Sequence, residues 1–220
     1  MATWVVGDIH GQYKALQQVL ERSGFTAARD TLICLGDLVD RGPRPFECIF
    51  ALHELPNLVC IRGNHDENFL YFIRTGTDRF MGRNGVRATI DLWMTLAPSD
   101  KVRVESFFGQ QQPWYKNAGG QVFTHGGFDR HKLLEDQDED IFAWDRKLWE
   151  QAVSSGSAPL RFAEPCTRVF IGHTPTLNFE GNAPMLRGGI WNLDTGAAYR
   201  GGKLTMMNIE TEEYVQSDEI

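Results

Sequence analysis

The chain reads Thr3-Trp-Val-Val-Gly-Asp-Ile-His-Gly11 near its start. The apolar run Thr3–Val6 predicts a short buried strand, and Gly7 favours its end in a turn. Asp8 and His10 follow at once, so side chains of the kind that bind metals come directly after the strand. The same arrangement recurs along the chain, and its repetition predicts both the fold class and the site.

The first sixty residues alternate between predicted strands and helices. Apolar runs predict further buried strands at Thr31–Leu35 and Leu58–Ile61. Helical spacing of apolar residues predicts helices at Tyr13–Ser23 and from Pro45 to Leu55, since proline suits the first turn of a helix. This alternation is typical of a largely parallel buried sheet with crossover helices, so we expect an α/β fold.

The rest of the chain departs from this alternation. Residues from about Glu67 to Trp114 are rich in aromatic and helical patterning, which predicts a mainly helical insertion at about 67–114 beside the sheet. Strands are expected again at Gln121–Thr124 and Arg168–Ile171. Two later runs, Ile190–Leu193 and Lys203–Ile209, predict an antiparallel hairpin across a glycine-rich turn. Because no linker-like segment interrupts the chain, residues 1–220 are expected to form a single domain.

Composition narrows the class of protein. The formal net charge of −7 disfavours binding along a nucleic-acid backbone, because that affinity comes largely from Lys and Arg. No stretch approaches the roughly 18 apolar residues of a membrane span, and the N-terminus lacks the pattern of a signal peptide. We therefore expect no nucleic-acid or membrane partner. The cysteines show no paired spacing, which favours reduced thiols and a cytoplasmic location; they are Cys34, Cys48, Cys60 and Cys166.

Polar residues follow five of the predicted strands directly. They are Asp8 and His10, then Asp37, Asp40 and Arg41, then Asn64, His65 and Asp66, and finally His125 and His173. In open α/β sheets ligands bind beyond the carboxyl ends of the strands, so these side chains are expected to meet.

Crowded carboxylates and imidazoles repel one another or lose solvation unless a cation compensates, and divalent metals are the obvious candidates. Imidazole, carboxylate and amide ligands without a thiolate favour manganese, iron or zinc over magnesium or calcium.

Each of these motifs is weak when it stands alone. A single Asp-x-His is commonplace, a lone histidine is more often structural than a ligand, and glycines at strand ends often serve only turns. Five independent turn decorations, each in register with a strand end, would be an improbable coincidence.

Five segments, in their order along the chain, closely resemble the calcineurin-like metallophosphoesterase superfamily. They are Gly7-Asp-Ile-His-Gly11, Gly36-Asp-Leu-Val-Asp-Arg-Gly42, Arg62-Gly-Asn-His-Asp66, Thr124-His-Gly126 and Gly172-His-Thr174. Within the superfamily they resemble the PPP group of phosphoprotein phosphatases, especially the short bacterial and phage forms, as does the later segment Leu193-Asp-Thr-Gly-Ala197. The resemblance implies a four-layer α/β/β/α sandwich, in which two mixed sheets pack together and helices lie outside.

The resemblance also implies a binuclear metal centre, with Mn2+ the foremost candidate and Fe or Zn as alternatives. The first of two divalent metal ions would be bound by Asp8, His10 and Asp37, and the second by Asp37, Asn64, His125 and His173. Asp37 would bridge the two ions together with a water or hydroxide, since a carboxylate has two oxygens. Such a pair of ions stabilises both the attacking and the leaving oxygen of an in-line displacement, and the bridging hydroxide would attack phosphorus directly.

Further residues would act on the substrate. The resemblance makes His65 the proton donor to the leaving alkoxide, and Asp40 the acceptor that orients its ring. Arg41 is the best candidate for holding the phosphoryl oxygens, because a guanidinium offers paired donors. Arg146 lies in Trp144-Asp-Arg-Lys147, which resembles the Trp-x-Arg segment of the bacterial forms, and is a candidate second clamp; an ordinary surface arginine is the alternative.

Two positions depart from the pattern of the phosphoprotein phosphatases. Asp66 stands where they usually have Glu, and Gly126 where Ala is common. Asp66 is also found in related bacterial hydrolases that split diadenosine tetraphosphate symmetrically, but those enzymes usually lack a match to Asp40 and are typically longer. The resemblance therefore favours a phosphatase for phosphoserine and phosphothreonine, with phosphotyrosine as a further substrate.

Two alternatives remain beside the protein phosphatase. One is a symmetrical diadenosine tetraphosphate hydrolase or another enzyme whose partner is a small phosphoester, because it would use the same metal site. The other is a non-catalytic scaffold, which is disfavoured because such proteins usually lose a metal ligand or the catalytic histidine, and here every expected position is filled.

Overall fold

Two five-stranded sheets form the centre of the protein in a computed structural model that describes residues 1–220. The first sheet has the order β10 (Tyr214–Gln216), β9 (Thr205–Asn208), β1 (Thr3–Val6), β2 (Thr31–Cys34) and β3 (Leu58–Cys60). The second has the order β4 (Trp114–Lys116), β5 (Gln121–Thr124), β6 (Arg168–Ile171), β8 (Ile190–Asn192) and β7 (Met185–Arg187). Each sheet contains both parallel and antiparallel pairs.

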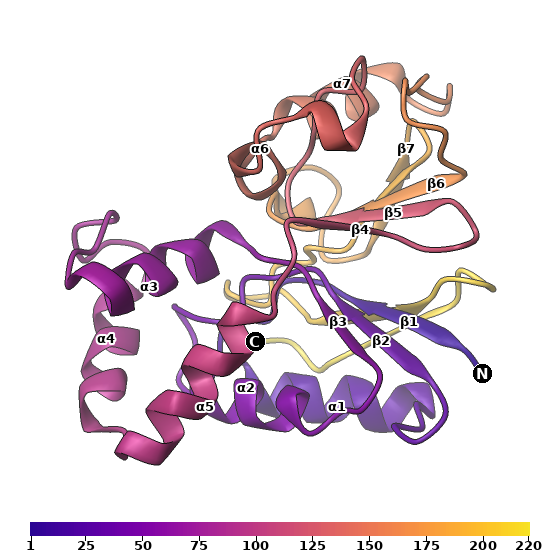
Figure 1. Ribbon diagram of the computed structural model, residues 1–220. Coiled ribbons are helices and arrows are strands. Elements are labelled where there is room, and N and C mark those ends of the chain that lie inside the picture. The colour runs from indigo at the N-terminus through magenta and orange to yellow at the C-terminus, as the bar shows by residue number, and fades with distance from the viewer.

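Helices cover the outer face of each sheet. The first sheet is covered by α1 (Tyr13–Ser23), α2 (Pro45–His53) and α5 (Pro98–Gly109), and the second by α6 (Asp140–Trp144) and α7 (Lys147–Ser155) (Figure 1). Two single-turn 3-10 helices lie in the connections, at Leu134–Asp136 and Thr176–Asn178. The layers therefore run helix, sheet, sheet, helix, and the expected four-layer α/β/β/α sandwich is confirmed.

The strands are buried on both faces, and alternate residues belong to different layers. Val6 and Cys34 face the helices of the first sheet, whereas Val5 and Ile33 face the second sheet. Because side chains alternate along a strand, a strand between two apolar layers needs hydrophobic residues at every position. The continuous apolar runs in the sequence are the direct result. Between the sheets, the rings of Phe123 from β5 and Phe170 from β6 stack with centroids 5.0 Å apart.

The expected insertion is helical and lies at one end of the sandwich. It contains α3 (Asn64–Thr75), α4 (Val86–Thr95) and α5, and it ends where Trp114 begins β4 (Figure 1). Its apolar side chains join the core beneath the first sheet, where the ring of Phe69 packs against those of Trp93 and Phe108 at 5.5 Å. The insertion is therefore packed firmly against the sandwich.

The predicted hairpin near the C-terminal end is wrong. The runs at Ile190–Leu193 and Lys203–Ile209 do form strands, but β8 lies in the second sheet and β9 in the first. Each pairs with a three-residue neighbour that the sequence pattern did not reveal, β8 with β7 and β9 with β10. The glycine-rich segment between them crosses from one sheet to the other instead of reversing within one sheet. Local turn signals do not distinguish these two paths.

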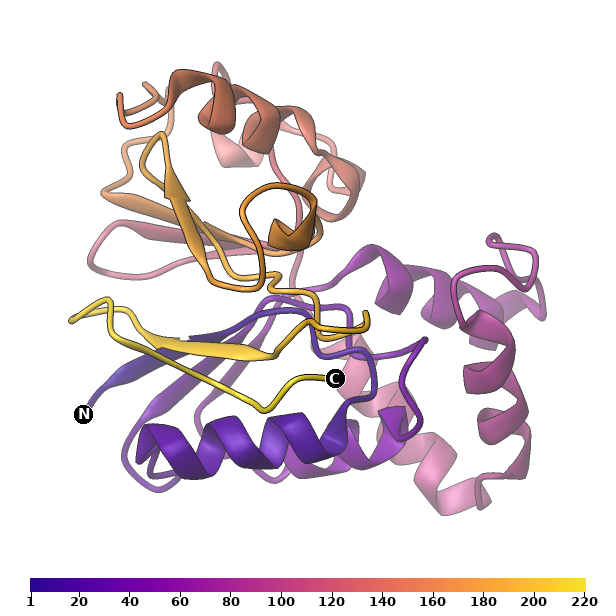
Figure 2. The same cartoon turned by 180° about the vertical axis from the view of Figure 1, so that it is seen from behind.

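The two ends of the described chain meet in the first sheet. Strand β9 pairs antiparallel with β1, and Trp4 lies opposite Asn208 (Figure 2). The carboxyl ends of β1, β2, β3, β5 and β6 all point toward the insertion, which places the residues that follow these strands around one region (Figure 1). None of the helices combines the length and the apolar character needed to cross a membrane.

Candidate metal centre

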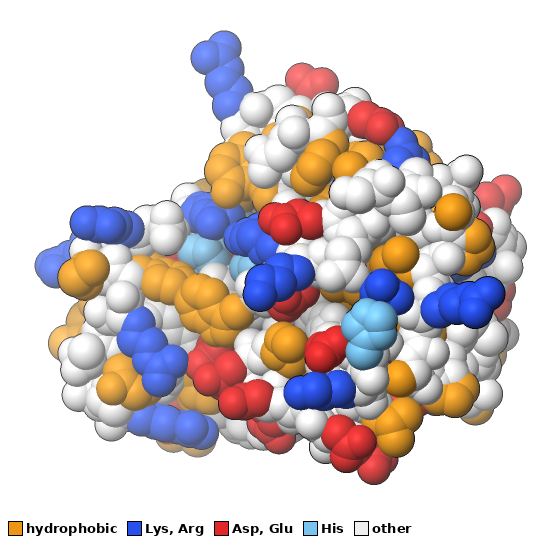
Figure 3. All heavy atoms as spheres, turned by 90° about the horizontal axis from the view of Figure 1, so that it is seen from above, with side chains coloured by type: hydrophobic (Ala, Val, Ile, Leu, Met, Phe, Trp, Pro, Cys, Tyr) orange, Lys and Arg blue, Asp and Glu red, His pale blue; other side chains and the backbone are white.

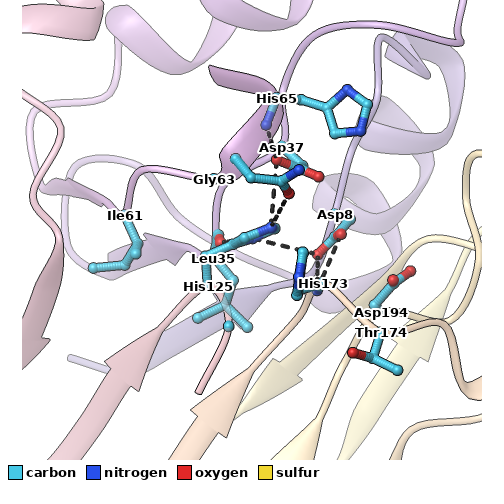
Figure 4. Close-up of polar contacts among 12 residues, drawn as sticks. Asp8, Leu35, Asp37, Ile61, Gly63, His65, His125, His173, Thr174 and Asp194 are labelled. Carbon is cyan, nitrogen blue, oxygen red and sulfur yellow. Dashed lines mark hydrogen bonds and ion pairs between the residues drawn. The ribbon is translucent and has the colours of Figure 1, made fainter. Parts of the chain in front are cut away.

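The structure brings all ten site residues predicted from the sequence into one contact network. Asp8 and His10 follow β1, the loop after β2 carries Asp37, Asp40 and Arg41, and α3 begins with Asn64 and His65 directly after β3. From the second sheet, His125 follows β5 and His173 follows β6 (Figure 4). Arg146 directly precedes α7 and lines the same cavity.

Asp37 lies at the centre of this network. Its Oδ2 is 3.4 Å from Nε2 of His10, and its Oδ1 is 3.4 Å from Nε2 of His125. Its Oδ1 also accepts a hydrogen bond from the backbone N–H of His65, at 3.0 Å. A Cβ on Gly63 would lie 2.1 Å from that Oδ1, so only glycine leaves room for the carboxylate there. The two oxygens of Asp37 therefore face two separate groups of ligands, as a bridging carboxylate must.

Two groups of ligand atoms share Asp37, and the atoms of each group lie within 4.8 Å of one another. One group is His10, Asp37 and His65, and the other is Asp37, His125 and His173. The second agrees with the predicted second metal site, and Oδ1 of Asn64 adjoins it at 3.2 Å from Nε2 of His125. In the first group, His65 stands where the expected set has Asp8.

Asp8 adjoins the second group instead. Both its carboxylate oxygens lie 3.2 Å from the backbone nitrogen of His173, and its Oδ1 is 4.0 Å from Nδ1 of His125 (Figure 4). A Cβ on Gly172 would lie 2.1 Å from Oδ1 of Asp8. The carboxylates of Asp8 and Asp37 thus both rest against a glycine, in cradles that any side chain would fill.

Backbone carbonyls hold the ligand histidines in defined orientations. Nδ1 of His10 lies 2.8 Å from the carbonyl oxygen of Val39, and Nδ1 of His125 lies 2.8 Å from that of Leu35. In both rings Nδ1 is thus engaged by the backbone, and Nε2 is the nitrogen that lies on the side of Asp37, at 3.4 Å from it. Such partners fix the tautomer of metal-binding histidines and orient their rings. The donor set and its supports therefore fit divalent metal ions.

Burial sets the charges of the carboxylates. Asp8 and Asp37 are 3% and 2% exposed. Burial and the neighbouring Asp194 carboxylate raise the pKa of Asp8 well above its ordinary value. Burial would also raise the pKa of Asp37, but the imidazoles of His125 and His65 hold that pKa well below its ordinary value. Burial would lower the pKa of His125, yet the Asp37 and Asp8 carboxylates raise it to about 10.

The other two imidazoles are held neutral. Burial lowers the pKa of His10 well below its ordinary value, and Arg41 and His65 reinforce the effect. Burial, His125 and Arg146 do the same to the pKa of His173. Neutral imidazoles are the form that binds metals, and buried carboxylates gain most from a neighbouring cation.

The backbone of the site is strained. Eight non-glycine residues in the chain have positive φ, and five of them are predicted site residues: His10 at 45°, Asp37 at 50°, Asp40 at 69°, Arg41 at 67° and His173 at 67°. Left-handed conformations cost free energy for residues with a Cβ, and such outliers cluster at functional sites. Here the strained turns allow each loop to direct its side chain back over the strand ends.

His65 and Asp40 form a buried pair beside the ligand groups. Nδ1 of His65 lies 2.6 Å from Oδ2 of Asp40, and both side chains are at most 3% exposed. Asp40 is itself held by α4, because its backbone N–H donates to Oγ1 of Thr89 at 3.0 Å. Burial raises the pKa of Asp40, and its hydrogen bond with His65 opposes that rise. The pair orients His65 so that its Nε2 faces the cavity.

Two arginines reach the same cavity. Nη1 of Arg41 is 2.7 Å from Nε2 of His10, and its Nη2 is 3.0 Å from Nε2 of His65, while its guanidinium lies 5.1 Å from the ring centroid of Tyr199. Nη1 of Arg146 donates to the carbonyl oxygen of His173 at 2.7 Å and to Oγ1 of Thr174 at 2.8 Å. Arg146 is therefore tied to the loop of a candidate ligand, unlike a free surface arginine.

The cavity over the site has a volume of about 290 Å³. Its lining combines candidate ligands and arginines with three aromatic residues: Asp37, Arg41, Asn64, His65, Phe80, Asn84, Trp144, Arg146, His173 and Tyr199. Figure 3 shows histidine side chains at the surface with Lys and Arg beside them and hydrophobic side chains adjoining, although the whole chain carries a net charge of −7. The local positive charge suits an anionic group such as a phosphoester.

Sequence reasoning missed several residues of this region. Asp194 follows β8 and is 4% exposed, and burial raises its pKa to about 6. The strand-end pattern that revealed Asp8 also applies to Asp194, so the signal was available. Asp66 supports the site structurally, because its carboxylate accepts hydrogen bonds from the N–H of Leu38 at 2.8 Å and from Nε2 of Gln111 at 3.0 Å. Thr89 and the aromatic residues of the cavity have no comparable local signal.

Comparison with known proteins identifies relatives along nearly the whole chain. The profile of the family described as Calcineurin-like phosphoesterase matches residues 1–208. Serine/threonine-protein phosphatase 1 of Salmonella typhimurium is 28% identical over 217 residues, which cover 94% of this chain and 91% of that protein. A symmetrical bis(5'-nucleosyl)-tetraphosphatase of Pseudomonas fluorescens is 46% identical over 128 residues, which cover 58% of this chain and 42% of that enzyme. A solved structure described as a diadenosine tetraphosphatase shares the fold, with a TM-score of 0.75, 20% identity and coverage of 100% of this chain and 94% of that chain.

Proposed function

Because the chain belongs to the calcineurin-like phosphoesterase family, we propose that this hydrolase is a phosphoprotein phosphatase that uses two divalent metal ions, Mn2+ foremost. Its substrates would be phosphoserine and phosphothreonine, with phosphotyrosine as a further one. The observation that carries the proposal is the buried pair of His65 and Asp40, 2.6 Å apart, where His65 adjoins His10 and Asp37 in the first of the two groups that share Asp37.

The pair suits the cleavage of an alkyl phosphoester. Hydrolysis breaks the bond between phosphorus and the ester oxygen, and the departing alkoxide is strongly basic unless it receives a proton. With Nδ1 directed at Asp40, Nε2 of His65 faces the cavity and can donate that proton. The positive charge of the doubly protonated ring is stabilised by the Asp40 carboxylate.

The remaining predicted residues bind and orient the phosphoryl group. Asp8, His10, Asp37, Asn64, His125 and His173 would hold the two metal ions. Bound there, divalent cations would supply an activated water and neutralise charge on the phosphoryl oxygens. Arg41 and Arg146 line the same cavity from two different segments, and guanidinium groups pair well with phosphoryl oxygens.

A second candidate function is symmetrical hydrolysis of dinucleoside tetraphosphates. It is favoured by the higher identity, 46%, to the Pseudomonas fluorescens enzyme over part of the chain. Coverage does not separate the two functions, since the phosphatase matches 94% of the chain and another dinucleotide hydrolase matches 97%. The phosphatase is supported by Asp40, because the dinucleotide hydrolases usually lack its counterpart. A cavity of about 290 Å³ also lies just below the usual range of ligand pockets, about 300–1,000 Å³.

A substrate panel tests the choice. Protein loaded with Mn2+ is assayed on a phosphoserine peptide, a phosphotyrosine peptide of the same sequence, and diadenosine tetraphosphate, and kcat/KM is compared. We expect the phosphopeptides to be preferred. A strong preference for the dinucleotide would overturn the phosphatase assignment, and no uptake of any divalent metal ion would favour the non-catalytic scaffold.

A further inference from the structure

The connection between α3 and α4 is ordered by side-chain hydrogen bonds, although it contains no helix or strand. Its centre is the carboxylate of Asp78, whose Oδ1 accepts hydrogen bonds from the N–H of Phe80 at 2.8 Å and from Nδ2 of Asn68 at 3.1 Å. Oδ2 of Asp78 accepts from the N–H of Gly82 at 2.5 Å. Asn68 returns the contact, because its Oδ1 accepts the N–H of Arg79 at 2.9 Å. We call residues 77–85 the 77–85 loop.

The 77–85 loop is packed directly on the catalytic residues. A Cβ on Gly85 would lie 2.3 Å from the backbone nitrogen of Arg41, and Asn84 lines the cavity. The ring of Phe80 lies against the ring of His65, with centroids 5.0 Å apart and planes at 67°. The loop therefore places an apolar ring beside the proposed proton donor.

A second aromatic ring extends this surface. The ring centroid of Trp144 lies 5.8 Å from that of Phe80, with the planes at 79°. Trp144 is 41% exposed, yet its indole N–H donates to Oε2 of Glu67 at 2.8 Å, which fixes the ring. All three hydrophobic residues that line the cavity are aromatic, since Tyr199 is the third.

The position of Phe80 determines which part of a substrate it can touch. An ester oxygen that receives a proton from His65 must lie within hydrogen-bond reach of Nε2. The group bonded to that oxygen then comes next to Phe80. In a phosphoserine this group is a single methylene, in a dinucleoside polyphosphate it is another phosphate, and in an aryl phosphate it is a flat ring. Only the flat ring gains from an edge-to-face or offset contact with an aromatic wall.

We propose that Phe80 and Trp144 form a subsite for the leaving group of aryl phosphomonoesters, which gives phosphotyrosine an added affinity that phosphoserine of the same sequence does not gain. The proposal rests on the proposed function, because it places the phosphoryl group at the metal centre and the leaving oxygen at His65. The rings contribute to binding and take no part in bond making: water adds to phosphorus, the bond from phosphorus to the aryl oxygen breaks, and the phenol leaves with one proton.

The test replaces the aromatic surface while keeping it apolar. We would compare Phe80→Leu with the wild type on phosphotyrosine and phosphoserine peptides of one sequence. The expected result is a fall of about tenfold in kcat/KM for phosphotyrosine, carried mainly by KM, with phosphoserine changed by less than about twofold. Trp144→Leu should act in the same direction, because it removes the second ring. It keeps the backbone carbonyl of residue 144, which lies 3.3 Å from Nε2 of His173.

Phe179→Leu is the matched control. Phe179 is 41% exposed, as Trp144 is, and it packs edge-to-face on a tryptophan, Trp149, as Phe80 does. Phe179 does not line the cavity. This variant should leave both peptides unaffected. An equal loss on both peptides in Phe80→Leu would mean that Phe80 only supports His65, and no loss on either would mean that it touches no substrate; both results overturn the subsite.

A binding measurement separates the subsite from the proposed function. Phenylphosphonate and methylphosphonate are non-hydrolysable, and calorimetry with Mn2+-loaded protein gives their dissociation constants directly. Phe80→Leu should raise the constant for phenylphosphonate about tenfold and leave that for methylphosphonate unchanged. If the wild type cleaves only dinucleotides while this difference persists, the proposed function fails and the subsite stands. If phosphopeptides are cleaved while the difference is absent, the subsite fails alone.

Discussion

The loops that follow the strands and the 77–85 loop line the same cavity, but they are built by different means. After the strands, His10, Asp37 and His173 adopt positive φ, and glycines leave room for the carboxylates of the site. The 77–85 loop also has positive φ, at Met81 and Asn84, but it is held in addition by a side chain, the carboxylate of Asp78, and it contributes the ring of Phe80. The difference suggests a division of labour, in which backbone geometry sets the chemistry and side-chain packing sets the selectivity.

The largest expected effect comes from Asp37→Asn, which removes the charge of the side chain that the two ligand groups share. The amide has no charge and only one oxygen, so both metal sites should weaken. We expect kcat to fall by at least about 1,000-fold, comparable to the loss of a principal electrostatic stabiliser. Metal content by mass spectrometry and turnover with added Mn2+ are the measurements, and retention of two ions at full affinity would contradict the bridging role.

His65→Asn should separate chemistry from metal binding. The variant loses the proposed proton donor, so turnover of an alkyl phosphoester should fall by about 100- to 10,000-fold. An aryl phosphoester should lose less, because a phenolate is a better leaving group and needs less protonation. Metal binding should be retained. Kinetics on the two esters, with calorimetry of Mn2+ binding, would check this, and full activity on the alkyl ester would refute the acid role of His65.

Gly63→Ala tests the backbone constraint directly. The added Cβ would meet Oδ1 of Asp37 at 2.1 Å, and a displacement of about 1 Å at a reacting centre can cost about 100-fold in rate. Gly109→Ala is the matched control, because its Cβ would meet nothing within 4 Å. We expect kcat to fall about 100-fold in the first variant and to stay within about twofold in the second. Similar kinetics in both would show that the cradle is not needed.

The smallest effect should come from Asp78→Asn in the 77–85 loop. Hydrogen bonds from Gly82 and Asn68 overcome the effect of burial and hold the pKa of Asp78 below its ordinary value of 3.8. Its charge therefore stabilises the fold above pH 3.8, and that contribution is lost as the pH falls toward the lowered pKa. We expect the variant to be less stable by about 1 kcal/mol at pH 7.

Denaturant unfolding of both proteins at several pH values would check this expectation. The stability difference should shrink as the pH falls below 3.8, because Asp78 then takes up a proton in the unfolded chain while it is still ionised in the folded one. A difference that does not change with pH would contradict the charge-based role. Turnover of a phosphoserine peptide should change by less than about twofold, since Asp78 itself contacts none of the candidate metal ligands and its hydrogen bonds to Phe80, Gly82 and Asn68 can largely be kept by the amide oxygen.

The convergence of the strand-end side chains was largely predictable because each of these segments is local in the sequence. An apolar run, a glycine and a ligand-type side chain stand within a few residues, as at Val6, Gly7 and Asp8. Parallel strands then bring such segments to one edge without further information. Asp194 shows that even the missed ligand-type residue carried this pattern.

The remaining features depend on contacts between distant segments. The path of the chain from β8 to β9 depends on which sheet offers a free edge, and no turn signal encodes that choice. Thr89 reaches Asp40 across 49 positions, and Phe80 meets Trp144 only once α3 and α6 have packed. Helical periodicity predicts that the insertion is helical, but it does not predict which ring faces the cavity.

The pairing of β1 with β9 has a consequence for how the chain folds during synthesis on the ribosome. Strand β1 can pair with β9 only after Asn208 has been synthesised, so this edge of β1 stays open while the residues between Trp4 and Asn208 are made. Contacts between such distant positions slow folding, and an unpaired edge invites aggregation meanwhile. The first sheet therefore stays incomplete until β9 and β10 have been synthesised.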